Sequence, residues 1–251
     1  MSKRGEIDWG ITKGVLETIQ EINPAFTTEN YLIGGSAAWF YKTFLEKESD
    51  PDFPAPTYTQ EENNLWYSKD IDFLGTKRED LPRELQTRPE GDPPIVKING
   101  IWIDSPNEGV FITRENAAKT ALEAENPETG GYYKVASPTL LYKEKKRLGE
   151  MWKAGSRPQD ALHKRALKTA ARLLLCKLAE NKGLNQKQAA LLFKLLKETQ
   201  EIAPEIFASK PLLKRLGAQT ARLKTNPRTK AIYHLLKNQI LKEAKPGPEL
   251  G

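Results

Sequence analysis

The 251-residue sequence predicts an α+β fold, in which a small mixed sheet with flanking helices (residues 1–134) is followed by a basic all-helical domain (residues 135–251). Two changes along the chain predict this fold. Before about residue 135, short apolar runs alternate with Pro- and Gly-rich loops, and after it helical periodicity dominates. Residues 1–141 carry 14 Lys and Arg against 24 Asp and Glu, a net charge of −10, whereas residues 142–251 carry 25 against 9, a net charge of +16.

This charge asymmetry indicates that the two parts have different tasks. A strongly basic part is typical of proteins that hold nucleic acid. The alternative is that the basic side chains only solvate the outer faces of the helices.

The composition excludes several classes of protein. With 38% hydrophobic and 29% charged residues, the chain has the balance of a folded protein and not of a disordered one. The single cysteine, Cys176, excludes an intramolecular disulfide, and two histidines leave little for a zinc centre. The sequence holds no apolar run near the roughly 18 residues of a membrane span, and its first ten residues lack the apolar core of a signal peptide. We therefore expect a cytoplasmic protein with no membrane partner.

The first part predicts strands, one helix and an insert. Residues 31–33 form a strand-like run, and residues 37–45 have helical character. Residues 46–64, acidic and Pro-bearing, are expected to form an exposed insert. The alternation in residues 70–74 indicates a half-buried strand, and Asn-Gly within residues 95–104 predicts a hairpin.

The second part predicts helices. Residues 157–180 place apolar side chains along one helical stripe. Asn185 and Gln188 have the spacing of a capping pair that opens another helix through Leu196. A last helix is expected over about residues 227–242.

Gly34, Gly35 and Ser36 stand between the first strand and the first helix. Two glycines let backbone N–H groups approach a ligand closely, and a helix N-terminus favours negative charge, so this break is a candidate phosphate site. Ser36 stands where an N-cap hydroxyl is expected. The alternative is an ordinary turn followed by a cap.

Asp70 and Asp72 are two residues apart on the next strand, so both carboxylates project from the same face. Such a pair repels itself unless a cation lies between the groups, and hard oxygen ligands suit Mg²⁺. The alternative is a strand end with two exposed acids.

Together, Ile33–Gly34–Gly35–Ser36 and Asp70–Ile71–Asp72–Phe73 resemble the signature of the DNA polymerase beta superfamily of nucleotidyltransferases. Ser36 and Asp70 are 34 positions apart, more than in compact members of that superfamily, and the insert accounts for the excess. Members use a third carboxylate on a neighbouring strand, for which Asp104 at the end of the hairpin is the candidate. Asp104 can also be read as an acid that opens a loop.

Residues 135–148 and 157–160 are similar to stretches of the abortive-infection type E branch, the toxin-like minimal nucleotidyltransferases. This resemblance implies that Lys143 and Lys145 contact a triphosphate and that Asp160 is the later acid of the site. Asp160 can also be explained as an acid that stabilises the start of a helix.

The resemblance implies a metal-dependent enzyme that moves a nucleoside monophosphate from a nucleoside triphosphate to an acceptor hydroxyl, with two Mg²⁺ ions held by the three aspartates. The basic part favours RNA as acceptor, and the resemblance to the toxin-like branch, which includes enzymes that modify tRNA, implies the 3′ end of tRNA. A neutralising acidic protein is a further possible partner. The alternatives are transfer to a protein or small-molecule hydroxyl, and a non-catalytic module that binds nucleic acid. Basic residues proposed to contact RNA are Arg157, Arg165, Lys168 and Arg172.

Overall fold

The computed structural model describes residues 30–48, 50–66, 70–74, 96–98, 101–104, 106, 108–125, 132–151, 157–225, 234 and 237–238. The helix expected over residues 227–242 lies outside this part except for three positions.

A mixed six-stranded sheet forms one side of the molecule, in the order β3-β4-β2-β1-β6-β5. Strand β1 is antiparallel to β2 and parallel to β6, and β2 is parallel to β4. The β3–β4 and β5–β6 pairs are antiparallel. The α+β class predicted from the sequence is confirmed. The strands are β1 (Tyr31–Ile33), β2 (Asp70–Leu74), β3 (Val96–Ile98), β4 (Ile101–Asp104), β5 (Leu122–Glu125) and β6 (Tyr132–Val135).

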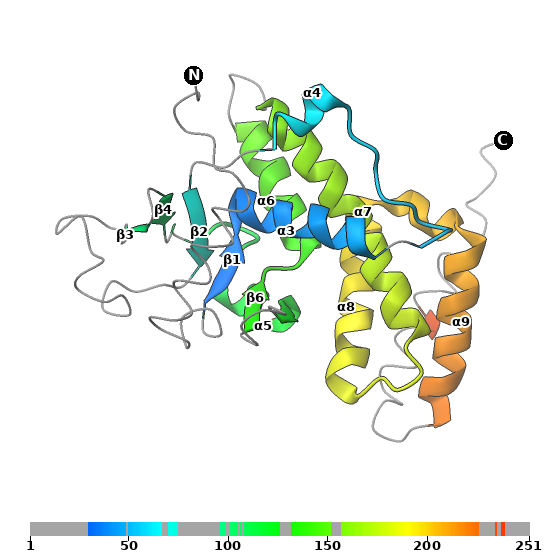
Figure 1. Cartoon of the computed structure of the whole chain (residues 1–251). Helices are drawn as coiled ribbons and strands as arrows, with labels where there is room; N and C mark the ends of the chain where they lie inside the picture. Colours follow the sequence, from blue (N-terminus) through cyan, green and yellow to red (C-terminus); the bar gives the residue numbers. More distant parts are fainter. Residues whose placement is uncertain are drawn as a thin grey trace.

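Helices cover the sheet and continue beyond it, so that α7, α8 and α9 lie side by side away from the strands (Figure 1). The Asn185–Gln188 capping box opens α8 as predicted, because each side chain bonds the other's backbone N–H. The helices are α3 (Gly34–Lys47), α4 (Gln60–Asn63), α5 (Arg114–Thr120), α6 (Pro138–Met151), α7 (Pro158–Glu180), α8 (Gln186–Ile202), the 3₁₀ helix η3 (Pro204–Ala208) and α9 (Lys210–Thr225). None of these helices is long and apolar enough to cross a membrane.

Helix α7 belongs to both large apolar clusters of the described chain. Its longer N-terminal part, through Leu174, packs into a cluster with the sheet, α3 and α6. Its C-terminal part, from Leu175, packs into a cluster with α8 and α9. Inside the first cluster Tyr41 of α3 is fully buried, and its hydroxyl donates a hydrogen bond to the Ala136 carbonyl at 2.9 Å. This bond fixes α3 against the chain that follows β6.

The acidic insert is largely exposed, as the sequence predicted, and it lies against the helices (Figure 1). Arg215 of α9 binds Asp50 at 2.7 Å and Asp52 at 2.6 Å. Arg165 of α7 binds Glu62 at 3.0 Å and the Thr57 carbonyl at 3.2 Å. Many side chains of the segment are still exposed, but ion pairs between the acidic insert and the basic helices hold it in place. We call residues 50–66 the strap.

Candidate metal and phosphate site

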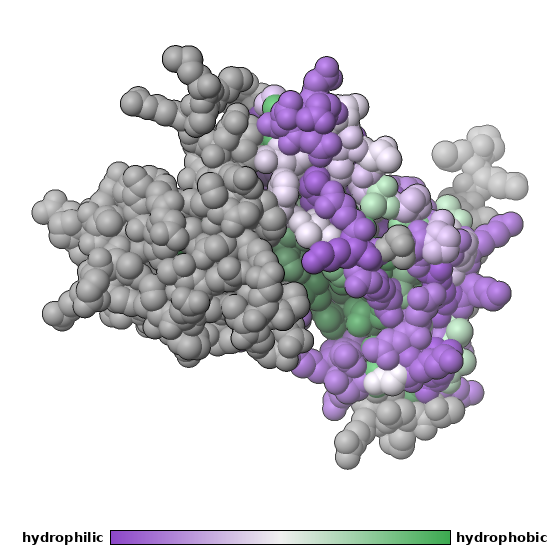
Figure 2. Space-filling view, in the orientation of Figure 1, coloured by the Kyte–Doolittle hydropathy of each residue, from purple (hydrophilic) through white to green (hydrophobic). Residues whose placement is uncertain are grey.

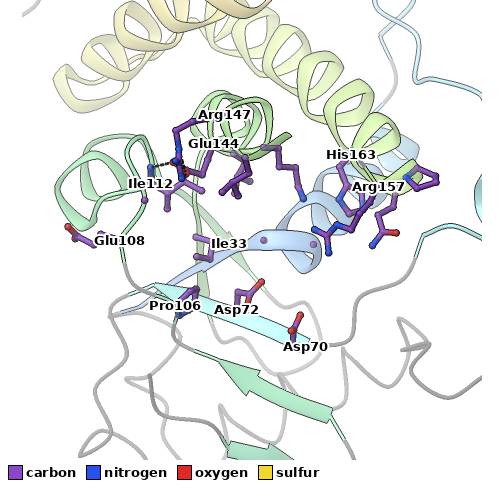
Figure 3. A pocket seen from close by; sticks show the side chains of 18 residues that line it. Ile33, Asp70, Asp72, Pro106, Glu108, Ile112, Glu144, Arg147, Arg157 and His163 are labelled. Atoms are coloured by element: carbon purple, nitrogen blue, oxygen red, sulfur yellow. Dashed lines mark hydrogen bonds and ion pairs between the residues drawn. The ribbon is translucent and has the colours of Figure 1, made fainter. Parts of the chain in front are cut away.

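Three aspartates from neighbouring strands form the centre of the site. Strands β2 and β4 are parallel and pair with Asp72 opposite Asp104, and Asp70 lies two residues before Asp72 on the same face. Each aspartate offers a carboxylate oxygen, and these oxygens lie within 4.8 Å of one another. Figure 3 shows Asp70 and Asp72 projecting from β2 toward the pocket. The structure thus brings together the three carboxylates that were predicted from separate segments.

The carboxylates of Asp70 and Asp104 make ionisation of Asp72 less favourable. Burial, together with the negative charges of Asp70 and Asp104, raises the pKa of Asp72 from 3.8 to about 7. The positive charges of Lys145 and Arg157 act in the opposite direction but do not compensate. A divalent cation would remove this repulsion, and three carboxylate oxygens are the ligands that Mg²⁺ prefers. The donor set therefore fits such an ion.

Gly34 lets α3 begin directly against the carboxylates. Its φ is +67°, in the left-handed region, and a Cβ at this position would lie 2.0 Å from the Asp72 Oδ2 atom. The helix has no side-chain hydrogen bond at its N-cap, Ile33, so the cap leaves its first N–H groups without that partner. Gly34 and Gly35 both line the pocket. The glycine break predicted as a phosphate site thus lies beside the candidate metal ligands.

Ser36 does not cap the helix, contrary to the prediction, because α3 begins two residues earlier. The serine is buried in the first turn, and its hydroxyl donates a hydrogen bond to the Asp70 carbonyl at 3.3 Å. Ser36 therefore ties α3 to β2 at the residue that carries the first aspartate.

A lysine and an arginine face the aspartates from the helical side. Asp160, near the start of α7, binds the Lys145 ammonium at 3.2 Å and the Arg157 guanidinium at 3.2 Å. Burial lowers the pKa of Lys145, although Asp160 and Asp72 oppose this effect. Burial would raise the pKa of Asp160, but Lys145 and Arg157 outweigh it and the net shift is downward. Asp160 is thus an ionised group that orients both cations.

Lys143 lies apart from this group. Its ammonium pairs with Glu201 of α8 and lies 6.0 Å from the centroid of the Phe111 ring. Positions two residues apart on a helix point to different sides, so α6 cannot direct both Lys143 and Lys145 into the pocket.

The structure also leaves three of the four predicted RNA contacts outside the pocket. Arg165 pairs with Glu62 of the strap. Lys168 and Arg172 both pair with Glu205 of η3. Arg157 is the member of the set that lines the pocket.

Sequence reasoning missed the wall of the pocket opposite the aspartates. Glu144 of α6 is buried and accepts hydrogen bonds from the backbone N–H groups of Phe111, at 2.8 Å, and of Ile112, at 3.4 Å. Its carboxylate also pairs with Arg147, and it lies so close to Gly109 that a Cβ there would be 2.6 Å away. In the sequence Glu144 stands within a lysine-rich run and carries no signal of this role.

His163 of α7 also lines the pocket, a place that the sequence did not indicate. Its imidazole lines the pocket yet is buried, and within the described chain its Nδ1 atom has no hydrogen-bond partner. Burial, followed by the charge of Lys145, lowers its pKa to about 3, so the ring is neutral near pH 7. The apolar neighbours on its helix face make it look like a core residue in the sequence.

These groups enclose a cavity of about 640 Å³. Asp70, Asp72 and the two glycines form one side of it, and the start of α7 and the middle of α6 form the other (Figure 3). Comparisons of the chain with family models, with curated proteins and with solved structures found no match. The functional argument therefore rests on this geometry and on the short motifs.

Proposed function

We propose that the protein is a metal-dependent nucleotidyltransferase, which moves a nucleoside monophosphate from a nucleoside triphosphate to an acceptor hydroxyl, most simply at the 3′ end of a tRNA. One observation carries the proposal: three carboxylates on adjacent strands lie beside a glycine-initiated helix, and two of them, Asp70 and Asp72, share one cavity with Lys145. Metal ligands, phosphate donors and a counter-charge are the parts that transfer of a nucleotidyl group requires.

Different groups of the chain would bind the metal, bind the triphosphate and position the cationic side chains. Asp70, Asp72 and Asp104 would hold Mg²⁺, which when bound neutralises phosphate charge and activates the attacking hydroxyl. The first N–H groups of α3 and the Lys145 ammonium donate hydrogen bonds to the triphosphate. Asp160 keeps Lys145 and Arg157 in place for this contact.

The reaction joins the acceptor oxygen to the α-phosphorus and breaks the bond from that phosphorus to the oxygen that bridges to the β-phosphate. Pyrophosphate leaves, and the hydroxyl proton passes to solvent. Catalysis of this kind depends mainly on positioning and charge neutralisation. The neutral His163 and the paired Glu144 are not required as nucleophiles.

The acceptor is argued from charge. Residues 142–251 carry a net charge of +16, which suits a polyanion better than a small neutral molecule. Transfer to a protein side chain or to a small hydroxylated molecule is the competing enzymatic function, and a silent scaffold that binds RNA is the non-enzymatic one.

The test combines the protein with Mg²⁺, bulk tRNA and each of the four α-labelled nucleoside triphosphates. We expect label on tRNA with one or two of them. The Asp72→Asn variant should transfer none, and Glu61→Gln, which removes an exposed strap carboxylate outside both cavities, should act as wild type.

Other outcomes would overturn parts of the proposal. Label on the protein itself would replace RNA with a protein acceptor. No label and no release of pyrophosphate would refute the enzymatic function, and near-normal transfer by Asp72→Asn would refute the assignment of the site.

A further inference from the structure

A second cavity lies at the far end of α7 from the aspartates, where this helix meets α9. It is an open groove of about 760 Å³. Five basic side chains line it, and we call it the α7–α9 groove. They are Lys182, Lys210, Lys214, Arg215 and Arg222.

One arginine pairs with all the acidic side chains of the groove. Arg215 binds Asp52 at 2.6 Å and Glu180 at 3.1 Å, the two acids that line the groove, and Asp50 behind them at 2.7 Å. The hydrogen bond to Asp50 is the main reason that the pKa of Arg215 is raised. These contacts hold the three acids in a fixed network, and five basic side chains against three acids leave the groove with a net positive charge.

Three lysines are left to face solvent. Lys182, Lys210 and Lys214 are exposed, and none of them forms an ion pair with another described residue. Lys143, Lys168 and Lys177, by contrast, each have an acidic partner. Figure 2 shows the hydrophilic surface over α9 and the end of α7. Uncompensated positive charge is thus concentrated in a hollow.

The groove lies at a defined distance from the aspartates. Pro158 lines the first cavity and Glu180 lines the groove, and they are the two ends of α7. At 1.5 Å per residue the helix places them about 33 Å apart. The one-turn spacing of two DNA half-sites has about the same length, roughly 34–36 Å, and an A-form RNA duplex, whose turn is shorter, spans this distance in slightly more than one turn.

We propose that the α7–α9 groove binds the phosphodiester backbone of the RNA acceptor about one helical turn from the end that reaches the aspartates. Lysine ammonium groups are mobile point charges, so they suit phosphates in any sequence and hold the RNA without reading its bases. The role of the groove in positioning an acceptor rests on the proposed function, but its binding of RNA can be measured without catalysis. The groove replaces Arg165, Lys168 and Arg172 as the proposed contact for RNA, because these three side chains form ion pairs with Glu62 and Glu205.

The test measures binding of an end-labelled RNA hairpin by fluorescence anisotropy over a range of salt concentrations, in the Asp72→Asn background so that catalysis plays no part. Lys182, Lys210 and Lys214 are changed together to Gln. The matched control changes three exposed lysines outside the groove, Lys119, Lys146 and Lys197, so that the net charge falls equally.

For a hairpin with a stem of about one turn, we expect the groove variant to reduce the magnitude of the slope of log affinity against log salt by about 2 to 3. The reason is that each lost phosphate contact contributes about 0.7 to 0.9 to this magnitude. The control variant should lower it by less than 1. For a stem of about 4 base pairs, which is shorter than half a turn, the groove variant and its parent should bind alike.

Each contrary result has a definite meaning. Equal losses in the groove and control variants would show that binding depends only on net charge and would overturn the proposal. Equal losses with long and short stems would overturn the distance of one turn. Binding of a poly-glutamate peptide in place of RNA would assign the groove to an acidic protein. Absence of transfer by the wild-type protein, with groove-dependent binding of RNA intact, would instead count against the proposed function alone.

Discussion

Asp72→Asn removes one negative charge from the centre of the three carboxylates and keeps the shape of the side chain. In the metal-free protein the pKa of Asp72 is raised from 3.8 to about 7, chiefly by burial and then by the charges of Asp70 and Asp104. The folded state therefore prefers the protonated acid. The stabilising effect is complete below the unfolded value and is lost as the pH rises through about 7.

The size of this effect follows from the shift in pKa. Each pKa unit corresponds to about 1.4 kcal/mol, so ionised Asp72 costs the metal-free fold up to about 4 kcal/mol above pH 8. About half of this cost develops between pH 5.5 and pH 8. Solvent that enters the pocket screens the repulsion. We therefore expect Asp72→Asn to gain about 1–2 kcal/mol of stability relative to wild type over that interval.

The measurement is urea unfolding of both proteins at about pH 5.5 and pH 8, first with a chelator and then with Mg²⁺. In the chelator the variant should become the more stable protein as the pH rises. Added Mg²⁺ should reverse the order, because an ion at 100 times its dissociation constant stabilises the wild type by about 2.7 kcal/mol. Asp52→Asn is the control, and its difference from wild type should not change between the two pH values.

Two results would refute this reasoning. One is a variant that is less stable than wild type in chelator by the same amount at both pH values, which would mean that the carboxylates do not repel one another. The other is equal stabilisation of variant and wild type by Mg²⁺, which would place the ion elsewhere.

Three further variants test other parts of the structure. Gly34→Ala puts a Cβ 2.0 Å from the Asp72 Oδ2 atom and should lower the rate of nucleotidyl transfer at least about 100-fold. Stabilisation by Mg²⁺ should also be lost in the same urea assay. Normal transfer would show that the start of α3 can shift to make room for the Cβ. Glu144→Gln weakens four hydrogen bonds to a buried carboxylate and should cost about 1–3 kcal/mol in urea unfolding. No loss of stability would show that other contacts hold the chain at Phe111 in place. Arg215→Ala removes the anchor of the strap and should speed cleavage of residues 50–66 by a protease at least about tenfold, while unchanged cleavage would mean that Arg165 alone holds the strap.

Local patterns were sufficient to predict the strands that carry the aspartates. The alternation around Asp70 and Asp72 and the Asn-Gly hairpin before Asp104 each specify a strand, and a shared sheet face follows from their period of two. The capping pair Asn185–Gln188 is equally local, since its bonds span three residues. These are the predictions that the structure confirms.

The partners of charged side chains could not be predicted in this way. Arg165 and Glu62 are 103 positions apart, so their ion pair depends on the path of the strap over α7. The same holds for Glu144, whose backbone partners are more than 30 positions away. The boundary between the two predicted domains near residue 135 stays a prediction.

The course of α7 through both apolar clusters has a consequence for cooperativity. The N-terminal and C-terminal parts of α7 are buried in different clusters, so unfolding of one cluster exposes residues of the other. The free energies of opening the two ends of the helix are therefore linked. Any ligand that stabilises the aspartate end should therefore slow amide hydrogen exchange in α8 and α9, which it does not touch. Conversely, a cavity made at Leu195 or Leu216 should weaken binding at the aspartates, because the folded population that binds is reduced.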